Sequence, residues 1–519
     1  MPQRPPCSGK QLTAAVDDIL TAVHLPRPEV NVASVQYDSR RVNPGDIFVA
    51  IPGRRTDGHR YIPEAILAGA VGVVLERATW FRWIRQHAPT VNIWQVRSAR
   101  QAAARLTRYR YAHVLRDLTV FAVTGTKGKT TVTHWLQHTL RCAGIPCARI
   151  GTLGMDPDFG IWTGLTTPEA PDLGAYVERL HAHGMRYLVM EASSIGLDQY
   201  RVDGVWVTVA GFLNLGRDHL DYHGTPAAYF AAKARLFDYA YWGIRAAVYH
   251  TGDAHGARLA KACRPPEGVA VWTFGICTQP RAGCPHQVHI GVTHADLSGS
   301  RGWIHAPGMA APITWSVSLS GTFNVVNFGM VWTILAAHFG VERVCAWLPH
   351  VTSFRGAPGR MERITLPNDR TVVIDYAHTP ESLASVLAHL KPHVRRRLIV
   401  LFGCGGERDT GKRPLMGRVA AEWADWIVLT DDNPRHEDPE RIIADITRGI
   451  RAVAAPPPTT VIRDRQQAVW HVLDQMQPGD CVLLAGKGAE TYQIYGDTRV
   501  PYSDRSTVET WVKRHVVPA

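Results

Sequence analysis

The chain has 519 residues, of which 45% are hydrophobic and 20% are charged, and it carries a formal net charge of +12. This length suggests about three domains of ordinary size, and the composition excludes a disordered or fibrous chain. The basic residues are dispersed rather than gathered in one stripe, so small polyanionic substrates suit the net charge at least as well as nucleic acid does, and charge alone does not decide between them.

Three α/β segments follow one another along the chain, and we place their boundaries at 1–112, 113–355 and 356–519. This division rests on short apolar runs, which are separated by glycine- and proline-rich turns or by helical patterns. In the first segment we expect a helix over 61–70, a strand over 71–75 and a linking helix over 98–108. In the second we expect buried strands over 118–123, 187–190, 207–212 and 246–249, an antiparallel excursion over 287–319 and a helix over 324–339.

The third segment is predicted to be a second α/β unit. Its buried strands are expected over 371–374, 398–402, 426–429 and 481–484. Each of them ends in a polar or glycine-rich loop, where open parallel sheets bind their ligands. The predicted fold class is therefore α/β in three domains: a small N-terminal domain, a central parallel sheet of the P-loop ATPase kind and a Rossmann-like C-terminal domain.

A glycine-rich turn between strand 118–123 and a helical pattern is the strongest functional signal. Such a strand–loop–helix segment can hold phosphate oxygens on its backbone amides. Lys129 would reach the terminal phosphates and the Thr130 hydroxyl would bind Mg²⁺. Val123 stands where the general pattern has a glycine, so the loop is a shortened form. Its residues are Gly125, Thr126, Lys127, Gly128, Lys129, Thr130 and Thr131.

Further ligand-capable residues follow the next predicted strands. Glu191 ends one strand and is a candidate second Mg²⁺ ligand, or alternatively a helix cap. His219 lies in a polar cluster at 214–224 and could bind metal, position phosphate or be structural. Lys233 falls among apolar residues of a helix; a buried lysine favours its neutral form and reacts with CO₂, whereas a surface lysine would extend to solvent.

Together, the glycine-rich turn, Glu191, Asp218-His219 and Lys233 resemble the Mur ligases, the ATP-dependent amide-forming enzymes of peptidoglycan assembly. The ordered set of further motifs is similar to the branch that adds the third residue of the stem peptide, and it runs from about residue 30 to 500. These motifs begin at Tyr37, Pro44, Asp57, Thr166, Ser193, Phe323, Gly359, Asp375, Gly403, Asp432 and Gly486.

The resemblance implies a role for each matching position. The first domain would hold the uridine diphosphate end of UDP-N-acetylmuramoyl-L-alanyl-D-glutamate, and the central domain ATP and two Mg²⁺ ions. Lys233 matches a lysine that is carbamylated, which would give Mg²⁺ an oxygen ligand. The nucleotide-sugar and dipeptide contacts would be Tyr37, Ser39, Arg54, Arg55, Thr56, Thr166, Thr167, Ser193, Gln199 and Arg201. The ATP contacts would be residues 125–131, Asn324 and Arg360, and the residues at the metals Thr130, Glu191, His219 and carbamylated Lys233.

The third domain would bind the incoming amino acid. Asp432-Asn433-Pro434-Arg435 resembles the motif that selects meso-diaminopimelate over lysine, because a guanidinium suits the distal carboxylate that lysine lacks. Arg408, Gly486 and Glu490 match the other contacts, with Glu490 taking an ammonium group. The implied reaction forms an acyl phosphate and ADP, after which the amine displaces phosphate. Lys129, Lys233, His219 and Glu191 are the residues expected at the chemistry.

Two positions depart from the family pattern, Ile195 and Ala489, where histidines are usual. Ala489 lies between two proposed amino-acid contacts, so lysine or relaxed specificity stays open as an alternative. The rival readings are another ligase of the superfamily, such as folylpolyglutamate synthetase, and a non-catalytic nucleotide- or nucleic-acid-binding protein. No apolar run reaches the length of a membrane span and no signal peptide is evident, so we expect a cytoplasmic monomer without membrane association.

Overall fold

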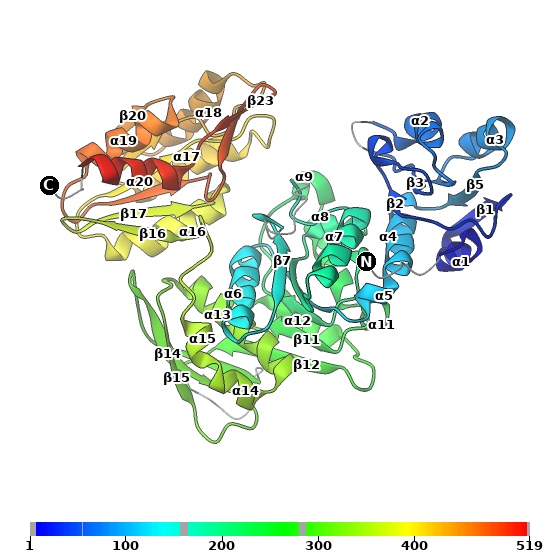
Figure 1. The fold of residues 1–519 in the computed structure, drawn as a ribbon. Helices are drawn as coiled ribbons and strands as arrows, with labels where there is room; N and C mark the ends of the chain where they lie inside the picture. Colours follow the sequence, from blue (N-terminus) through cyan, green and yellow to red (C-terminus); the bar gives the residue numbers. More distant parts are fainter. Residues whose placement is uncertain (1–6, 54–55, 156–163, 280–286, 516–519) are drawn as a thin grey trace. The chain divides into compact units, whose positions relative to one another are not determined.

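The computed structural model describes residues 7–53, 56–155, 164–279 and 287–515. The chain forms three α/β domains, coloured from blue to red along the sequence in Figure 1. They group into two compact units. The first comprises Met1–Gly291, Ile304–Ile313 and Val326–Val351, and the second comprises Val292–Trp303, Thr314–Val325 and Thr352–Ala519.

The N-terminal domain contains a five-stranded sheet with the order β1-β5-β4-β3-β2. Only the β1–β5 pair is antiparallel among its described strand pairs. Apolar residues cover both faces of this sheet, as expected for parallel strands flanked by helices. The strands are β1 Leu20–His24, β2 Val35–Gln36, β3 Ile47–Val49, β4 Gly72–Leu75 and β5 Asn92–Val96, and the helices are α1 Gly9–Ala15, α2 Ile62–Leu67, α3 Ala78–His87, α4 Ala99–Arg110 and α5 Ala112–Leu115.

Two of the predicted elements in this domain are confirmed with small changes. The linking helix is α4, which begins one residue after Ser98, and the Ser98 side chain accepts a hydrogen bond from the Gln101 amide as its N-cap. The predicted helix over 61–70 is shorter than expected: a 3₁₀ turn, Gly58–Tyr61, leads into α2. Pro63 stands in the first turn of α2, where its missing N–H costs nothing.

The central domain contains a ten-stranded sheet with the order β15-β14-β13-β12-β11-β10-β6-β9-β7-β8. The run from β13 through β7 is parallel, and β6 lies between β10 and β9. The carboxyl ends of these three strands therefore meet at one edge, where α/β proteins bind their ligands. The strands are β6 Thr119–Thr124, β7 Cys147–Gly151, β8 Gly154–Met155, β9 Tyr187–Glu191, β10 Val209–Phe212, β11 Ala246–His250, β12 Ala270–Ile276, β13 Val288–Asp296, β14 Gly299–His305 and β15 Ile313–Val317.

The four predicted buried strands are confirmed as β6, β9, β10 and β11, with ends shifted by one or two residues. The predicted antiparallel excursion corresponds to β13, β14 and β15; two residues join β13 to β14, which requires these neighbours to run antiparallel. The helices are α6 Lys129–Cys142, α7 Ala170–Ala182, α8 Ser194–Asp198, α9 Leu220–His223, α10 Pro226–Ala234, α11 Tyr239–Trp242, α12 Ala254–Ala262, α13 Thr322–Phe339, α14 Val341–Ala346 and α15 Leu348–Thr352.

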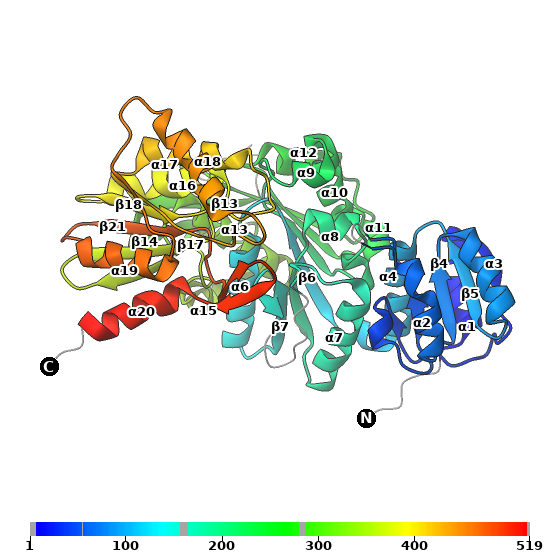
Figure 2. The same ribbon diagram turned by 90° about the horizontal axis from the view of Figure 1, so that it is seen from above.

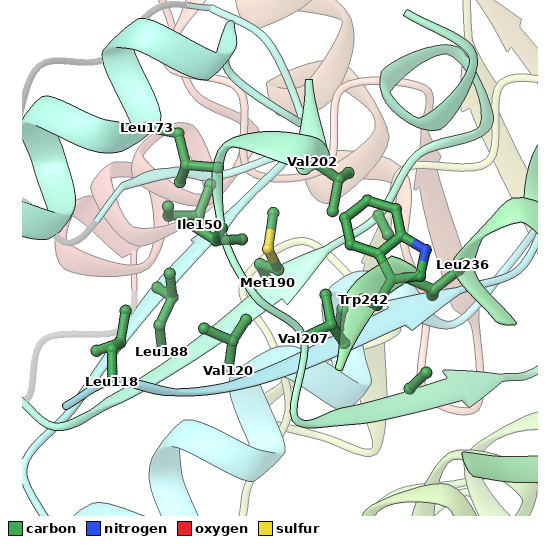
Figure 3. Packing of buried hydrophobic residues seen from close by; sticks show 14 of the residues in the cluster. Leu118, Val120, Ile150, Leu173, Leu188, Met190, Val202, Val207, Leu236 and Trp242 are labelled. Atoms are coloured by element: carbon green, nitrogen blue, oxygen red, sulfur yellow. The ribbon is translucent and has the colours of Figure 1, made fainter. Parts of the chain in front are cut away.

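Helices cover both faces of the central sheet. Figures 1 and 2 show α6 on one side of β7 and α7 on the other. On the α7 side, alternate residues of β6 and β9 form a buried cluster with Leu173 and Trp242; Figure 3 shows Val120, Leu188 and Met190 on the same face. Each such buried side chain contributes about 1.5–3 kcal/mol to stability. These contacts hold the strands whose ends carry the functional residues.

Helix α13 corrects one expectation from the sequence. By length and composition alone it could cross a bilayer, so the statement that no run reaches that length is wrong. In the structure 67% of the helix is buried. A Cβ at its Gly329 would lie 2.3 Å from the Ile290 side chain, and Phe328 packs 5.9 Å from Trp135 between ring centroids. This close packing is that of an inner helix of the domain.

The C-terminal domain contains a six-stranded sheet with the order β16-β17-β21-β18-β19-β20, parallel except for β16. The four predicted strands are confirmed as β17, β18, β19 and β21. The strands are β16 Glu362–Leu366, β17 Arg370–Asp375, β18 Leu398–Phe402, β19 Trp426–Leu429, β20 Thr459–Val461, β21 Cys481–Ala485 and the hairpin β22 Tyr492–Tyr495 with β23 Thr498–Pro501, and the helices are α16 Pro380–Leu390, α17 Lys412–Trp423, α18 Pro439–Arg451, α19 Arg465–Gln475 and α20 Asp504–His515.

A buried ion pair joins α19 to α20 in this domain. Arg465 Nε and Nη2 each donate to a carboxylate oxygen of Asp504 at 2.8 Å, and both side chains are 0% exposed. Arg465 Nη2 also donates to the Ala485 carbonyl at the end of β21, and the Tyr502 hydroxyl donates to Asp504. Two aligned hydrogen bonds and these added partners offset part of the dehydration cost of both charges, while Arg465 Nη1 is buried without a hydrogen-bond partner among the described residues.

Replacing Asp504 by alanine should destabilise this domain by about 3–5 kcal/mol, because it leaves a buried guanidinium without its counter-ion. Hydrogen–deuterium exchange of α20 and β21 measures the loss as a lower free energy of local opening. The control is Glu422→Ala, which removes an exposed i,i+4 pair with Arg418 and should cost about 0.5 kcal/mol or less. Similar losses in the two variants would contradict the importance of the buried pair.

Candidate active site

The glycine-rich turn, residues 125–131, joins β6 to α6 and is called the phosphate loop below, after its predicted role. Gly128 is the N-cap of α6 and has φ +90°, a left-handed conformation that favours glycine. A Cβ there would lie 2.4 Å from Asn327 Oδ1, so close packing also requires glycine. The loop therefore leads into the N-terminus of a 14-residue helix, the end that attracts phosphate.

Asn214, at the end of β10, holds the middle of the phosphate loop. Its Oδ1 accepts from the amides of Thr126 and Lys127 at 3.0 and 2.9 Å, and its Nδ2 donates to the Lys127 carbonyl at 3.1 Å. These two loop amides thus donate to Asn214, so the backbone amides at the start of α6 are the groups that could bind phosphate oxygens. The sequence analysis included position 214 in a polar cluster but did not assign it this role.

Two lysines converge on one backbone carbonyl. Lys129 Nζ donates to the Gly125 oxygen at 2.7 Å, and Lys233 Nζ, from α10, donates to the same oxygen at 2.9 Å. Lys233 is 1% exposed, and its Nζ lies 4.6 Å from the centroid of the Tyr229 ring. Burial, with the Lys129 charge next, holds the pKa of Lys233 well below its ordinary value. The structure thus places Lys233 in the interior of the domain, and the surface alternative is wrong.

Glu191, at the end of β9, connects the phosphate loop to β7. Its Oε2 accepts from the hydroxyls of Thr130 and Thr152 at 3.1 and 3.0 Å, and its Oε1 accepts from the Thr152 amide at 2.9 Å. The carboxylate is fully buried. A Cβ at Gly151 would lie 2.1 Å from Oε1, so β7 must end in glycine to accommodate Glu191.

His219 has a strained backbone conformation, with φ +52°, and its ring centroid lies 6.3 Å from that of Tyr229. Its ring is 47% exposed, and Nε2 lies 3.9 Å from Asp218 Oδ2. Burial lowers the pKa of His219, Asp218 opposes this, and the nearby charges of Lys129 and Lys233 lower it further. A neutral imidazole near the phosphate loop suits a metal ligand or a hydrogen-bonding group.

The oxygen ligands of Thr130 and Glu191 fit a Mg²⁺ ion that is held partly by phosphate oxygens of a bound nucleotide. Among the residues that the structure describes, no group of three or more His, Cys, Asp or Glu side chains forms a cage of its own. Mg²⁺ does not require one, since it usually takes one or two protein oxygens plus water and phosphate. The Thr130 hydroxyl and the Glu191 carboxylate, 3.1 Å apart between oxygens, are such hard donors.

The predicted dipeptide contacts gather next to Glu191. The Thr167 hydroxyl donates to the Glu191 carbonyl at 2.9 Å and lies 3.0 Å from Ser193 Oγ. Thr166 Oγ1 lies 3.3 Å from Thr152 Oγ1. Arg201 Nη2 donates to Gln199 Oε1 at 2.5 Å, and its Nη1 donates to the Thr167 carbonyl at 3.4 Å. The five predicted residues thus form one polar group within the first unit.

The predicted nucleotide-sugar contacts are only partly brought together. The Tyr37 hydroxyl donates to Asp172 Oδ2 of α7 at 2.6 Å, and burial together with this bond raises the pKa of Tyr37. The Ser39 side chain is buried. Thr56 Oγ1 lies 3.2 Å from the Tyr61 hydroxyl on the surface. Arg54 and Arg55 lie outside the described residues.

In the second unit, loops at the carboxyl ends of β18, β19 and β21 carry the predicted amino-acid contacts. Arg435 has φ +57°, and its Nη1 donates to the carbonyls of Gly406 and Asn433 at 2.7 and 3.4 Å. Among the described residues, no group accepts a hydrogen bond from Arg435 Nε or Nη2. Arg408 is exposed, whereas Asp432, Asn433 and Pro434 are buried.

Glu490 has a partner that the sequence analysis missed. Its Oε2 accepts from Lys487 Nζ at 2.7 Å and from Asn433 Nδ2 at 3.0 Å. Gly486 has φ +101°, and a Cβ there would lie 3.0 Å from Asp432 Oδ2. The Gly-Lys-Gly stretch was the available signal, because two glycines around one lysine suggest an unusual backbone path.

Asn324 and Arg360, the remaining predicted ATP contacts, belong to the second unit. Asn324 is buried at the start of α13, and its Nδ2 donates to the Ser320 carbonyl at 2.8 Å. The Arg360 guanidinium lies 4.4 Å from the centroid of the Tyr376 ring. Their roles toward a nucleotide stay predictions.

Comparisons with known proteins identify the family of this chain. Three family models match in order: the Mur ligase family catalytic domain at 31–114, the Mur ligase middle domain at 123–335 and the Mur ligase glutamate ligase domain at 359–488. UDP-N-acetylmuramoyl-L-alanyl-D-glutamate–2,6-diaminopimelate ligase of Synechococcus elongatus is 40% identical over 92% of this chain and 93% of its own length. The protein of that name from Thermosynechococcus vestitus is 38% identical over 97% of both chains. A solved structure of a ligase with this name is 32% identical, with a TM-score of 0.67 over 99% of this chain and 100% of its own. The chain belongs to the Mur ligase family.

Proposed function

We propose that this chain is an ATP-dependent ligase that joins meso-diaminopimelate to UDP-N-acetylmuramoyl-L-alanyl-D-glutamate, a step in the synthesis of peptidoglycan precursors. Residues 1–112 bind the uridine diphosphate end, residues 113–355 bind ATP, and residues 356–519 bind the amino acid. The enzyme acts as a cytoplasmic monomer on small-molecule substrates, independently of nucleic acid or membrane.

One observation supports the ligase proposal: a single buried residue, Glu191, connects the phosphate loop to the polar group around Thr167. Glu191 accepts from Thr130 of the loop through its side chain and from the Thr167 hydroxyl through its carbonyl. A bound γ-phosphate and a bound substrate carboxylate would therefore lie close together. Holding two reactants in such an arrangement is the main contribution of a phosphoryl-transfer site.

The reaction takes two steps. An oxygen of the substrate carboxylate attacks the γ-phosphorus of ATP, the bond to the β-phosphate oxygen breaks, and acyl phosphate and ADP result. The amine then attacks the acyl carbon, phosphate leaves with the bonding electrons, and the nitrogen loses a proton. Lys129 and the start of α6 stabilise phosphate charge, and Arg201 and Ser193 hold the acid substrate. Mg²⁺ would neutralise the phosphate charge at Thr130, Glu191, His219 and carbamylated Lys233.

The geometry of Arg435 favours a dicarboxylate amino acid. Its Nη1 donates to two carbonyls, so the Nε–Nη2 edge of the guanidinium faces away from these carbonyls. That edge matches the two oxygens of a carboxylate, and the distal carboxylate is what distinguishes diaminopimelate from lysine. Lysine or relaxed specificity is therefore less favoured.

Product analysis tests the proposal directly. The protein is incubated with ATP, UDP-N-acetylmuramoyl-L-alanyl-D-glutamate and, separately, meso-diaminopimelate, L-lysine and L-ornithine, and products are identified by mass. We expect one added diaminopimelate residue and ADP release that requires both co-substrates. In a parallel incubation with ATP, a folate and L-glutamate, extension of the folate would support the folylpolyglutamate alternative. Nucleotide binding without ligation in any incubation would support a non-catalytic binder.

Replacing Arg435 by lysine should raise KM for diaminopimelate about 10–100-fold, because a bidentate charged contact is lost. The efficiency ratio between diaminopimelate and L-lysine should fall, while KM for ATP stays within about twofold. Arg441→Lys, an exposed change on α18, is the control. An equal rise in KM for ATP would show that Arg435 is structural.

A further inference from the structure

Lys487 is a buried lysine in the second unit without an assigned role. It stands between Gly486 and Gly488, which have φ +101° and +52°. Residues other than glycine rarely adopt this left-handed backbone conformation. A Cβ at Gly488 would lie 2.8 Å from the Gly359 carbonyl oxygen and 2.9 Å from Tyr376 Cβ. These two glycines let the chain reverse direction on both sides of Lys487, whose side chain is 0% exposed.

The Lys487 ammonium lies within a closed set of hydrogen bonds. It donates to Asn433 Oδ1 at 3.0 Å and to Glu490 Oε2 at 2.7 Å. Asn433 Nδ2 donates to the same Glu490 oxygen at 3.0 Å, and the Ile494 amide donates to Asn433 Oδ1 at 3.0 Å. The lysine therefore contacts both side chains that are proposed to meet the incoming amino acid, and it fixes them relative to each other.

The partners of Glu490 are divided unevenly between its two oxygens. Oε2 accepts from Lys487 and from Asn433, whereas no described residue donates to Oε1, and the side chain is 23% exposed.

We propose that Lys487 is a positioning residue for the incoming amino acid: it fixes Asn433 and holds Glu490 through Oε2, so that Oε1 is presented to a substrate ammonium group. This inference rests on the proposed ligase function. It deepens that function by naming the residue that sets the ammonium site, which acts through Glu490 rather than through contact with the substrate.

The test compares Lys487→Met, Glu490→Gln and the double variant in the full-length protein. Lys487→Met should raise KM for meso-diaminopimelate about tenfold or more, with KM for ATP and for the nucleotide-dipeptide within about twofold of wild type. In the Glu490→Gln background, Lys487→Met should raise KM for meso-diaminopimelate less than about threefold, because Lys487 acts on the substrate through the Glu490 carboxylate. The double variant also removes both charges, so it leaves no unpaired buried ion and stays foldable.

The control is Lys391→Met, which removes another lysine–carboxylate pair of this domain, 39% exposed and with Asp425 oxygens at 2.7 and 2.8 Å; its kinetics should match wild type. Equal rises in all three KM values, or full multiplication of the single effects in the double variant, would overturn the positioning role. If the wild-type protein forms no product with any diamino acid, the proposed function itself fails. Product formation by wild type with an unchanged KM in Lys487→Met refutes this inference alone.

Discussion

Lys129→Ala should abolish turnover, lowering kcat about 10³-fold or more, because the transferred phosphoryl group loses its main protein cation. Lys129 is the first residue of α6, and its Nζ lies within hydrogen-bond distance of the Gly125 and Thr126 carbonyls. Its charge is thus held on the inner side of the phosphate loop. ADP release in the presence of both co-substrates measures the loss.

The protein offers a matched control for this change in Lys261, an exposed lysine of α12, whose replacement by alanine should leave the rate unaltered. A Lys129→Arg variant tests geometry at constant charge; it should stay strongly impaired, since a guanidinium is longer and planar. Near-normal turnover of Lys129→Ala would refute the assignment of residues 125–131 as the phosphate loop.

Lys233→Ala should lower kcat at least about 100-fold, and short carboxylates such as formate or acetate should restore part of it. Burial lowers the pKa of the Lys233 amine well below its ordinary value, which favours the neutral form, and the neutral amine is the form that attacks the carbon of CO₂. The new N–C bond gives a carbamic acid, which releases a proton to become an anionic carbamate. A carboxylate that diffuses into the alanine variant supplies the same kind of oxygen ligand.

Lys129→Ala serves as the crossed control for this rescue, because added anions cannot replace a missing cation. Carbon-13 NMR of the protein equilibrated with labelled bicarbonate should show a carbamate carbon that disappears in Lys233→Ala. Full activity of the alanine variant without additives would remove the carbamate from the mechanism. Equal rescue of both variants would show a general salt effect instead.

The elements that the sequence predicted well are those with strong local patterns. Strand β6, its glycine turn and α6 combine a short apolar run, a glycine and a helical period, and all three signals lie within about 25 residues, the scale over which local patterns are informative. The same holds for the C-terminal strands, which are short apolar runs followed by polar or glycine-containing loops. The order of the motifs along the chain then identified the family, which no single element could do.

The contacts that sequence reasoning missed join residues far apart in the chain. Asn214 holds loop amides 88 and 87 positions away, and Thr152 donates to a carboxylate 39 positions away. Such pairs depend on which strands become neighbours, and local patterns do not contain the strand order. Lys487 is close to Glu490 in sequence, but its burial follows from two left-handed glycines that were recognised only as a motif.

The strand order of the C-terminal sheet has a consequence for how the protein is made. β21, Cys481–Ala485, pairs with both β17 and β18, so the middle of this sheet comes from a late part of the chain. During synthesis, β17 and β18 leave the ribosome before β21, the strand that pairs with both of them. Until β21 is made, the edges of these two apolar strands lack their hydrogen-bonding partner. Distant pairing of this kind slows folding and exposes nascent chains to aggregation. Chaperone dependence and insolubility of fragments that stop before Cys481 are the expected signs.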